Sequence, residues 1–413
     1  MSVRRFGPVV IERRAVPSRR TLVLGRIGSI LLALAVGALV FLATGLAPAE
    51  SYRAMWEGSF GSLDALAETL VATSPILLTG LAVAIAGRAL LWNIGAEGQL
   101  FIGATFATAL ALWFPTSPRP VLLTLMVLAG GVGGALWALA PAILRARLAV
   151  NEIISTLMLN YVAILYVDYL VHGRWADPGS LGFPLSKPFT DNATLPSFFG
   201  TRLHLGFLLA LGAAGAFWLV LRGTKWGYEI RVIGESASAA RYAGMPVARN
   251  IVLVMLVSGA LAGVAGMAEV SGIVHRIQPD ISPGYGYTGI IVATLGRFSP
   301  IGVILAAFLF GALQVGGYSL QTVGATASAV GVLQGAILFI ALAGEFLARY
   351  HVRWQPGEAL PEPVLEEALE ADRARQAASS SADLADLAQA PLDHQGEPGT
   401  ERGASSDAEG ERL

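Results

Sequence analysis

Long apolar stretches alternate with short polar segments through most of the chain, from residue 22 to residue 347. A helix needs about 20 apolar residues to cross the hydrocarbon core of a bilayer. Ten stretches are candidates for such helices: 22–47, 69–91, 98–114, 121–144, 153–171, 205–221, 250–271, 288–295, 301–320 and 326–347. The eighth is too short to cross as a regular helix, so a broken or re-entrant segment is expected there. The pattern predicts an all-α, polytopic membrane protein with about ten transmembrane helices.

The polar segments divide the chain further and orient it. A basic N-terminal segment, 1–21, precedes the membrane domain, 22–347, and an acidic tail rich in Ala, Ser and Pro, 348–413, follows it. The tail has too few large apolar residues to fold alone, so we expect it to be disordered. Within the membrane domain, the topology places a loop at 173–203 outside and a loop at 223–249 in the cytoplasm.

The distribution of Lys and Arg supports this topology. With the N-terminus inside, eighteen of the Lys and Arg residues up to Arg353 fall on the cytoplasmic side and six on the outer side. An excess of positive charge in cytoplasmic loops is the usual signature of membrane orientation. An even number of spans preserves the asymmetry, so both termini are expected in the cytoplasm.

Composition narrows the possible chemistry. Hydrophobic residues make up 54% of the chain and charged residues 14%, whereas soluble domains carry roughly 25% charged residues. There is no cysteine, and the five histidines lie far apart, so we expect no metal site. No phosphate-binding loop of the form G-x-x-x-x-G-K-[ST] and no catalytic motif occurs in the sequence. The chain is therefore not expected to be an enzyme, and we assign no catalytic residues.

Two clusters of polar residues interrupt the apolar segments. Asn93, Glu97 and Gln99 lie among glycines in the segment 90–104, and Glu152, Thr156 and Asn160 recur every four residues on one helix face. A charged group at the bilayer centre costs about 2.5–3.5 kcal/mol even on the mildest scale, so such groups usually face a cavity or a partner. These six residues are candidates for lining or supporting a solute path. Hydrogen bonding between helices is the structural alternative.

A third cluster contains the residues Pro283, Gly284, Tyr285 and Gly286, before the short apolar run. Pro283, Gly284 and Gly286 preclude a regular helix at the start of that run, and a broken helix is tolerated in a membrane only where protein or water covers its backbone. Transporters often place two such breaks, one in each half of the chain, at the substrate path. The break at 95–98 pairs with this one, so these four residues are further path candidates. Tight packing of small residues is the alternative.

The cytoplasmic loop predicts a short helix over 235–243, which Gly244, Met245 and Pro246 terminate. A short exposed helix between two spans, too polar for the bilayer, is suited to docking onto a cytoplasmic partner. An inert connector is the alternative that composition leaves open.

Four segments together resemble one family. They read NIGAEGQ at 93–99, NEIISTLMLNY at 151–161, IGESASAARYAGM at 233–245 and SPGYGYTGIIVATLG at 282–296. They are similar to the binding-protein-dependent ABC transporter permeases of the ribose/branched-chain amino acid superfamily, in the branch that imports nucleosides and simple sugars. The similarity runs in order over 70–346, whereas the N-terminal segment and the acidic tail are not part of the pattern.

The resemblance implies an ABC importer permease fold in a bacterial plasma membrane. It implies a pore of two permeases, identical or homologous, with two cytoplasmic ATPase subunits that bind ATP and Mg, an external substrate-binding lipoprotein, and no nucleic acid. This chain itself would hold no cofactor. The coupling helix that docks onto the ATPase would span 234–244, with contacts from Gly234, Glu235, Ala239, Ala240, Tyr242 and Gly244. ATP binding and hydrolysis would then drive alternating access for a nucleoside or simple sugar.

A rival interpretation is an ion-coupled secondary transporter of a small solute. Such a protein needs no ATPase, but it would bind its ion at carboxylates near the membrane midplane. Glu97, Glu152, Glu269 and Glu345 all lie toward the ends of predicted spans, which disfavours this alternative.

Overall fold

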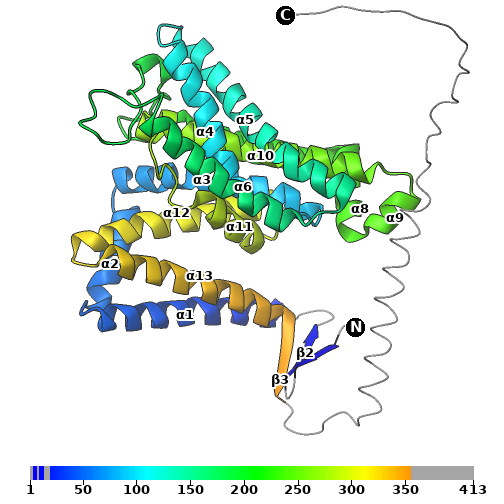
Figure 1. Ribbon diagram of the computed structural model, residues 1–413. Helices are drawn as coiled ribbons and strands as arrows, with labels where there is room; N and C mark the ends of the chain where they lie inside the picture. Colours follow the sequence, from blue (N-terminus) through cyan, green and yellow to red (C-terminus); the bar gives the residue numbers. More distant parts are fainter. Residues whose placement is uncertain (1–2, 7–8, 14–18, 355–413) are drawn as a thin grey trace, which may run out of the picture. The chain divides into compact units, whose positions relative to one another are not determined.

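The computed structural model describes residues 3–6, 9–13 and 19–354, which belong to two units (Figure 1). The larger unit, Val16–Arg349, contains the helices α1 to α13. Their bounds are α1 Arg19–Ala43, α2 Pro48–Phe60, α3 Leu63–Arg88, α4 Ala96–Trp113, α5 Arg119–Leu148, α6 Glu152–His172, α7 Leu205–Gly223, α8 Lys225–Glu235, α9 Ala237–Tyr242, α10 Val247–Glu269, α11 Tyr285–Leu295, α12 Pro300–Thr322 and α13 Ala327–Arg349. A 3-10 turn, η1, covers Asp191–Ala193, and a π-helical turn, η2, covers Val270–Val274.

The smaller unit is a three-stranded antiparallel sheet in the order β1-β2-β3. Strand β1 is Val3–Phe6, β2 is Val9–Arg13 and β3 is Tyr350–Trp354, with β2 paired on both sides. The sequence predicted no strand, because β1 and β2 lie in the segment described as a basic N-terminus and β3 lies in the segment described as an acidic tail. The all-α prediction therefore describes the larger unit and not the smaller one. Beyond Trp354, the predicted disordered tail lies outside the described residues.

Each of the ten predicted apolar stretches overlaps a helix of the larger unit. Among the described residues, six helices are long and apolar enough to cross a membrane: α3, α5, α6, α7, α10 with η2, and α12. A seventh candidate is the pair formed by the end of α1 and α2, which bends by 114°. The predicted polytopic membrane architecture is thus supported, although the number of spans by this criterion is six or seven rather than ten.

Helix α2 has no counterpart in the sequence prediction, because its composition is too polar for a span. It begins at Pro48, whose missing N–H is no loss in a first helical turn, and Glu50 lies in the same turn. Its buried Ser59 donates a hydrogen bond to the carbonyl of Ala312 in α12 at 2.7 Å. The helix therefore packs on the membrane helices.

The centre of the larger unit is formed by α3, α4 and α10. In the most apolar part of α3, 83% of the residues are buried inside the protein, against 28% for both α6 and α7. Helices α4 and α10 approach closely at Gly103 and Gly263: a Cβ added at Gly103 would collide with the backbone of Gly263. Small residues permit such close helix packing where the hydrophobic effect cannot drive association. Helix α3 is therefore a central element, and α6 and α7 are peripheral.

The chain is interrupted at both predicted breaks. Residues 89–95 separate α3 from α4, so the first break lies slightly earlier than predicted. After α10 and η2, an irregular segment leads to Gly284, whose φ of +95° suits glycine, and α11 begins at Tyr285. With 11 residues, α11 is the short helix that the eighth apolar stretch predicted.

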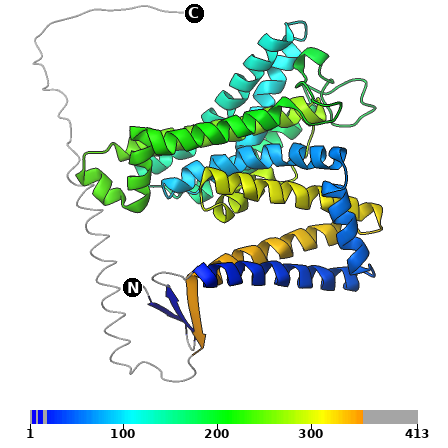
Figure 2. The same ribbon diagram turned by 180° about the vertical axis from the view of Figure 1, so that it is seen from behind.

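Two loop regions lie at opposite ends of the helices in the larger unit (Figures 1 and 2). One carries α8 and α9, and the other is the predicted external loop. This loop, predicted to be external, is folded against the end of α10: the N–H of Leu195 donates to the carbonyl of Ser271, and the hydroxyl of Ser271 donates to the carbonyl of Ala193.

Candidate functional site

The two interrupted segments meet directly. Oε2 of Glu97 in α4 accepts a hydrogen bond from the N–H of Gly286 at 2.6 Å. Gly286 lies in the first turn of α11, where N–H groups have no partner within the helix, so Glu97 acts as a cap from another helix. A Cβ at position 286 would lie 2.6 Å from Cα of Glu97, so only glycine fits this contact. The pairing of the two breaks, inferred from sequence, corresponds to a physical contact.

The start of α11 is held from a second side as well. The hydroxyl of Ser282 accepts hydrogen bonds from the N–H groups of Gly284, at 3.2 Å, and Tyr285, at 2.9 Å. The hydroxyl of Thr79, in the middle of α3, donates to the carbonyl of Tyr285 at 2.9 Å. Helix α11 therefore begins at a junction that both α3 and α4 secure.

Asn93 and Gln99 form a buried amide pair across the first break. Nδ2 of Asn93 donates to Oε1 of Gln99 at 2.8 Å, and Nε2 of Gln99 donates to Oδ1 of Asn93 at 3.1 Å. Nδ2 of Asn93 also donates to the hydroxyl of Ser258 in α10, which in turn donates to the carbonyl of Ala82 in α3. This pair, through Ser258, fixes the first break against α10 and α3.

Asn160 connects α6 to the same break. Its Oδ1 accepts from the N–H of Gly98 at 2.9 Å, and its Nδ2 donates to the carbonyl of Ile94 at 2.9 Å. Nδ2 also lies 3.3 Å from the hydroxyl of Tyr287 in α11. Asn160 is fully buried, so these bonds satisfy both ends of its amide.

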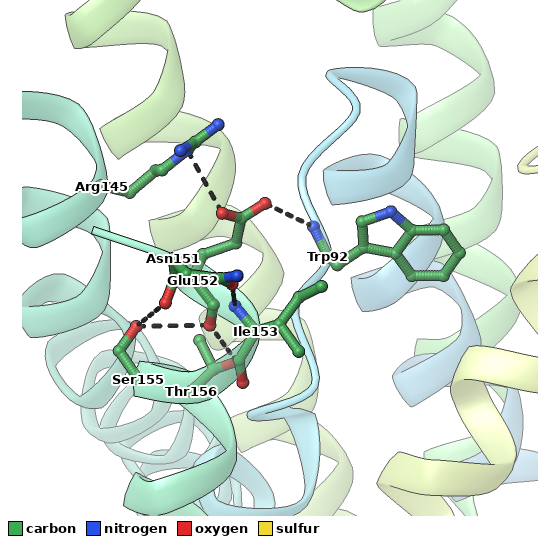
Figure 3. Close-up of polar contacts among 7 residues, drawn as sticks. All are labelled: Trp92, Arg145, Asn151, Glu152, Ile153, Ser155 and Thr156. Carbon is green, nitrogen blue, oxygen red and sulfur yellow. Dashed lines mark hydrogen bonds and ion pairs between the residues drawn. The ribbon is translucent and has the colours of Figure 1, made fainter. Parts of the chain in front are cut away.

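Glu152 and Thr156 have different roles although they share one helix face (Figure 3). Oε2 of Glu152 lies 3.2 Å from Nε of Arg145, and its Oε1 accepts a long bond, 3.4 Å, from the N–H of Trp92 in the first break. The hydroxyl of Thr156 instead donates to the carbonyl of Glu152 in its own helix. Thr156 still packs against the first break, since a Cβ added at Gly95 would lie only 3.0 Å from the Cβ of Thr156.

These contacts define what we call the polar cluster: Asn93, Glu97, Gln99, Glu152, Thr156, Asn160 and Ser258. All seven are buried. Sequence reasoning found all of them except Ser258, whose hydroxyl gives no distinctive signal in an apolar segment. The cluster joins the first and second breaks to each other and to α3, α6 and α10. Its polar groups are used in these bonds, which stabilise the junction and leave few hydrogen-bonding groups for a solute.

Two of the remaining predicted path residues border a cavity instead. Pro283 and Tyr285 line a cavity of about 640 Å³, together with residues of α2, α3, α10, α12 and the external loop. The polar lining residues include Glu68, Arg202, Glu269, Gln314 and Tyr318. Sequence reasoning assigned none of these to the path. The available signal was Gln314, a polar side chain within an apolar stretch.

The predicted coupling helix differs from the structure in its bounds. Instead of one helix over 235–243 there are two, α8 and α9, because Ser236 adopts an extended conformation between them. The hydroxyl of Ser236 accepts from the N–H of Ala239 at 3.2 Å and so caps α9. Glu235 is the last residue of α8, and Gly244, with φ of +74°, ends the motif.

The residues predicted to contact a partner point in different directions. Ala239, Tyr242 and Gly244 are exposed, and Tyr242 is 94% exposed, which is unusual for a large aromatic residue. Ala240 is fully buried within the protein. Gly234 also packs against its own chain, because a Cβ there would collide with the carbonyl oxygen of Arg88 at the end of α3. Ala240 and Gly234 therefore hold the loop in place, and the other residues remain available.

Arg88 links this loop to the end of α11 that lies away from the second break. Its Nε donates to the carbonyl of Phe298, just after α11, at 2.7 Å. Arg88 therefore contacts α8 through its carbonyl and the end of α11 through its side chain, while it terminates α3.

Comparison with known proteins agrees with the resemblance seen in the four sequence segments. The family described as "Branched-chain amino acid transport system / permease component" matches residues 65–342. The chain is 39% identical over 336 residues to the glucose ABC transporter permease protein TsgB13 of Haloferax volcanii, which covers 78% of this chain and 88% of that protein. It is 36% identical over 336 residues to the guanosine ABC transporter permease protein NupP of Bacillus subtilis, covering 78% of this chain and 93% of that protein.

A third relative is the nucleoside ABC transporter permease protein NupB of Lactococcus lactis, with 32% identity over 321 residues, 74% of this chain and 86% of that protein. No solved structure matches the chain. The matched region contains both interrupted segments, the polar cluster and the α8–α9 loop. The chain belongs to the family of branched-chain amino acid transport system permease components, the ABC transporter subunits that form the membrane path and leave ATP hydrolysis to a separate subunit.

Proposed function

We propose that this chain forms the translocation path for a nucleoside or simple sugar in an ATP-driven importer. The observation that carries this proposal is the junction of the two interrupted segments at Glu97 and Gly286, beside a cavity. Breaks of this kind are where transporters bind and gate their solutes. The names of the relatives, which specify guanosine, nucleosides and glucose, favour this solute class.

The proposed topology has ten spans over 22–347, with both termini in the cytoplasm of a bacterial plasma membrane. Helices α1 and α13, with 25 and 23 residues, are long enough to cross, and α4 has 18 residues. The 11 residues of α11 extend about 16 Å, roughly half a bilayer, so the irregular segment before it must complete that crossing. The basic segment 1–21 and the acidic tail 348–413 then flank the membrane domain on the inside.

In this arrangement the polar cluster supports the gate, and the solute contacts other residues. A buried, fully bonded network resists change until an external force acts on it. Pro283, Gly284, Tyr285 and Gly286 lie between the cluster and the cavity, so movement of the first turn of α11 would open or close the path. The gate is thus assigned to this turn.

Coupling to ATP is assigned to the exposed face of the α8–α9 loop, with Ala239, Tyr242 and Gly244 as contacts. The partner is a cytoplasmic ATPase subunit that binds ATP and Mg, and no cofactor is needed in this chain. A second permease, identical or homologous, and an external substrate-binding lipoprotein complete the importer. Rigid attachment of the loop supports this assignment: Nδ2 of Asn250 donates to Oε2 of Glu229 at 2.9 Å, and Nη1 of Arg231 donates to the carbonyl of Leu221 at 2.6 Å.

The test is uptake of radiolabelled guanosine and glucose by vesicles that contain the assembled complex and its binding protein. We expect uptake of at least one of the two with Mg-ATP on the cytoplasmic side and none with a non-hydrolysable analogue. An ionophore should have no effect. Uptake that persists without ATP and disappears with the ionophore would instead identify an ion-coupled transporter.

A further inference from the structure

The C-terminus of α3 is closed by a bonded turn in which glycine is the usual residue. The N–H of Leu91 donates to the carbonyl of Ala86 at 3.0 Å, and the N–H of Leu90 donates to the carbonyl of Gly87 at 3.1 Å. This pair of bonds is the Schellman motif, in which the residue just past the helix cap is left-handed and is usually glycine. Here that residue is Leu90, with φ of +55°. A side chain is strained in this conformation, because its Cβ crowds the following carbonyl oxygen.

The same chain places glycine in this turn elsewhere. Helices α1, α9 and α12 end with the corresponding pair of bonds, and the left-handed residue is Gly45, Gly244 or Gly324, with φ between +74° and +97°. Leucine at the end of α3 is therefore not explained by the turn itself. Its neighbour Leu91 is only 3% exposed and packs in the core, whereas Leu90 is 64% exposed. Leu90 is thus a strained residue whose apolar side chain is left largely uncovered by its own chain.

Leu90 lies next to the α8–α9 loop. A Cβ added at Gly234 in α8 would collide with the carbonyl oxygen of Arg88 and would lie 3.5 Å from Cα of Ala89, the residue before Leu90. Helix α3 is also the most buried of the six long apolar helices, with 83% of its most apolar part inside the protein. Its end therefore lies among other helices and not on the outer, lipid-facing surface.

Trp92 and a second strained turn extend this surface. The indole of Trp92 is 38% exposed and points away from Glu152, which accepts the main-chain N–H of the same residue (Figure 3). Its ring meets the ring of Phe298 edge to face, with centroids 6.3 Å apart. Phe298 closes the bonded turn after α11, where the left-handed residue is Arg297, which is exposed. Leu90 and Arg297, two exposed side chains at strained turns, therefore belong to neighbouring segments.

The ATPase that docks on the α8–α9 loop is the partner that suits this surface. The surface is continuous with that loop through the contact at Gly234. Apolar and aromatic residues beside an arginine are typical of protein interfaces, where such side chains become buried. Lipid would instead cover the peripheral helices α6 and α7, of which only 28% is buried.

We propose that Leu90 and Trp92 form a second contact for the cytoplasmic ATPase, next to the one at Tyr242. This inference rests on the proposed ATP-driven import and adds a contact at the first break itself. Motion of the ATPase then reaches the break directly, because the N–H of Trp92 is bonded to Glu152 and the next residue, Asn93, belongs to the buried amide pair.

The first test is photo-crosslinking, for which the chain is well suited because it contains no cysteine. Leu90→Cys is labelled with a benzophenone maleimide in the full chain, assembled with the ATPase in vesicles and irradiated. Adducts are identified by mass spectrometry, and the ATPase is recognised by the peptide of its phosphate-binding loop. We expect an ATPase adduct from Leu90→Cys and from Tyr242→Cys, and none from Phe199→Cys on the external loop.

Leu90→Gly tests the side chain without a bulky label. Glycine suits the left-handed conformation, so the thermal midpoint of the purified chain should be equal or higher. The affinity for the purified ATPase, measured by surface plasmon resonance, should fall about tenfold, the factor expected for loss of one buried leucine side chain. Ala149→Gly is the matched control: Ala149 is also exposed and left-handed, with φ of +51° after α5, but it carries only a methyl group. Its ATPase affinity should equal that of the parent.

The outcomes separate this inference from the proposed function. An ATPase adduct from Tyr242→Cys but not from Leu90→Cys, or adducts of Leu90→Cys only with lipid or with a second permease, would overturn the second contact while the proposed function stands. Parent-like ATPase affinity in Leu90→Gly would overturn it too, as would a lower thermal midpoint, which would show that the leucine packs on its own chain. If no ATPase binds the parent chain, the proposed function and this inference fail together.

Discussion

The carboxylate of Glu97 in α4 caps α11, which begins 188 residues later in the chain, through a 2.6 Å hydrogen bond from the N–H of Gly286. Two explanations of Glu97 follow from its position in the first turn of α4. A carboxylate there is stabilised by the dipole of its own helix, by about 0.3–1 kcal/mol. The cap on α11 adds a connection between the two breaks, and only this connection bears on the proposed gate.

The first prediction separates the two explanations with Glu97→Gln and Glu97→Ala. Glutamine keeps an acceptor for Gly286, whereas alanine leaves that buried N–H unsatisfied at a cost of about 1–3 kcal/mol. We expect uptake per assembled complex to fall strongly in the alanine variant and less in the glutamine variant, while ATP hydrolysis continues. Both rates are measured side by side in vesicles, with Glu57→Ala, an exposed change on α2, as the control. Parent-like uptake in both variants would assign Glu97 to helix stability alone.

The second prediction concerns the partner in that contact. In Gly286→Ala the new Cβ must displace the backbone of Glu97, so we expect a loss of about 1–3 kcal/mol, as for an over-packed core. The thermal midpoint of the purified chain should fall accordingly. Gly212→Ala is the matched control, because nothing lies within 4 Å of a Cβ at that helical position. There alanine should be neutral or slightly stabilising. Equal midpoints for the two variants would contradict the close contact.

The third prediction concerns docking of the ATPase at the α8–α9 loop. Tyr242→Ala removes a side chain that is 94% exposed, so insertion and stability should be unchanged while co-purification of the ATPase and uptake decrease. Phe199→Ala, at a site 92% exposed on the external loop, should leave co-purification intact. Ala240→Glu is a poor test, since position 240 is buried and a carboxylate there would disrupt the loop itself. Full co-purification with Tyr242→Ala would place the coupling contact elsewhere.

The fourth prediction concerns acid stability through His204, which precedes α7. Burial, with smaller contributions from His275 and Arg202, lowers the pKa of His204 from 6.5 to about 4. Its Nδ1 accepts from the N–H of Gly206 at 3.1 Å, so the neutral ring is the form that caps α7. Between pH 6.5 and pH 4 the unfolded chain binds a proton that the folded chain does not, so stability falls on acidification through this window.

The expected loss is about 2 kcal/mol at pH 5 relative to pH 7.5. It is measured as the decrease in thermal midpoint of the purified chain between these pH values. His204→Asn keeps a capping acceptor and removes the titrating ring, so its midpoint should depend less on pH. An unchanged pH dependence in this variant would show that His204 is not the responsible group.

The apolar stretches and the two breaks could be predicted from sequence because their causes are local. Length and hydropathy define a membrane helix, and Pro283 with Gly284 forbids a regular one. Helix α2 could not be predicted in this way, since its stability comes from packing such as that of Ser59 on α12. The strands were missed because a pairing between residues near the two ends of the described chain is not visible in either segment alone.

The sequence indicated which residue types belong to the candidate site, but not which neighbour each side chain contacts. A polar residue in an apolar segment indicates that something compensates it, and the contacts of Asn93 and Asn160 confirm that compensation. The period of four correctly grouped Thr156 with its neighbours, although its hydroxyl bonds only to its own helix. Whether a small residue such as Ala240 faces a partner or its own chain depends on how α9 packs, which composition does not specify. Glu269 was considered only as an ion ligand, because the cavity beside it forms from segments distant in sequence.

At Gly234 the main chain of α8 approaches the carbonyl of Arg88 at the end of α3 so closely that a Cβ there would collide with it. Side chains are the soft parts of a protein interface, since they can change rotamer and absorb a displacement. A contact between two backbones has almost no compliance, so a shift of α8 by a fraction of an ångström must be taken up by the neighbouring main chain. That neighbour is the non-helical segment 89–95, which leads from the end of α3 to the buried amide pair of Asn93 and Gln99. A displacement of the α8–α9 loop is therefore passed through the end of α3 to the first break, with no rotamer change at Gly234 to absorb it.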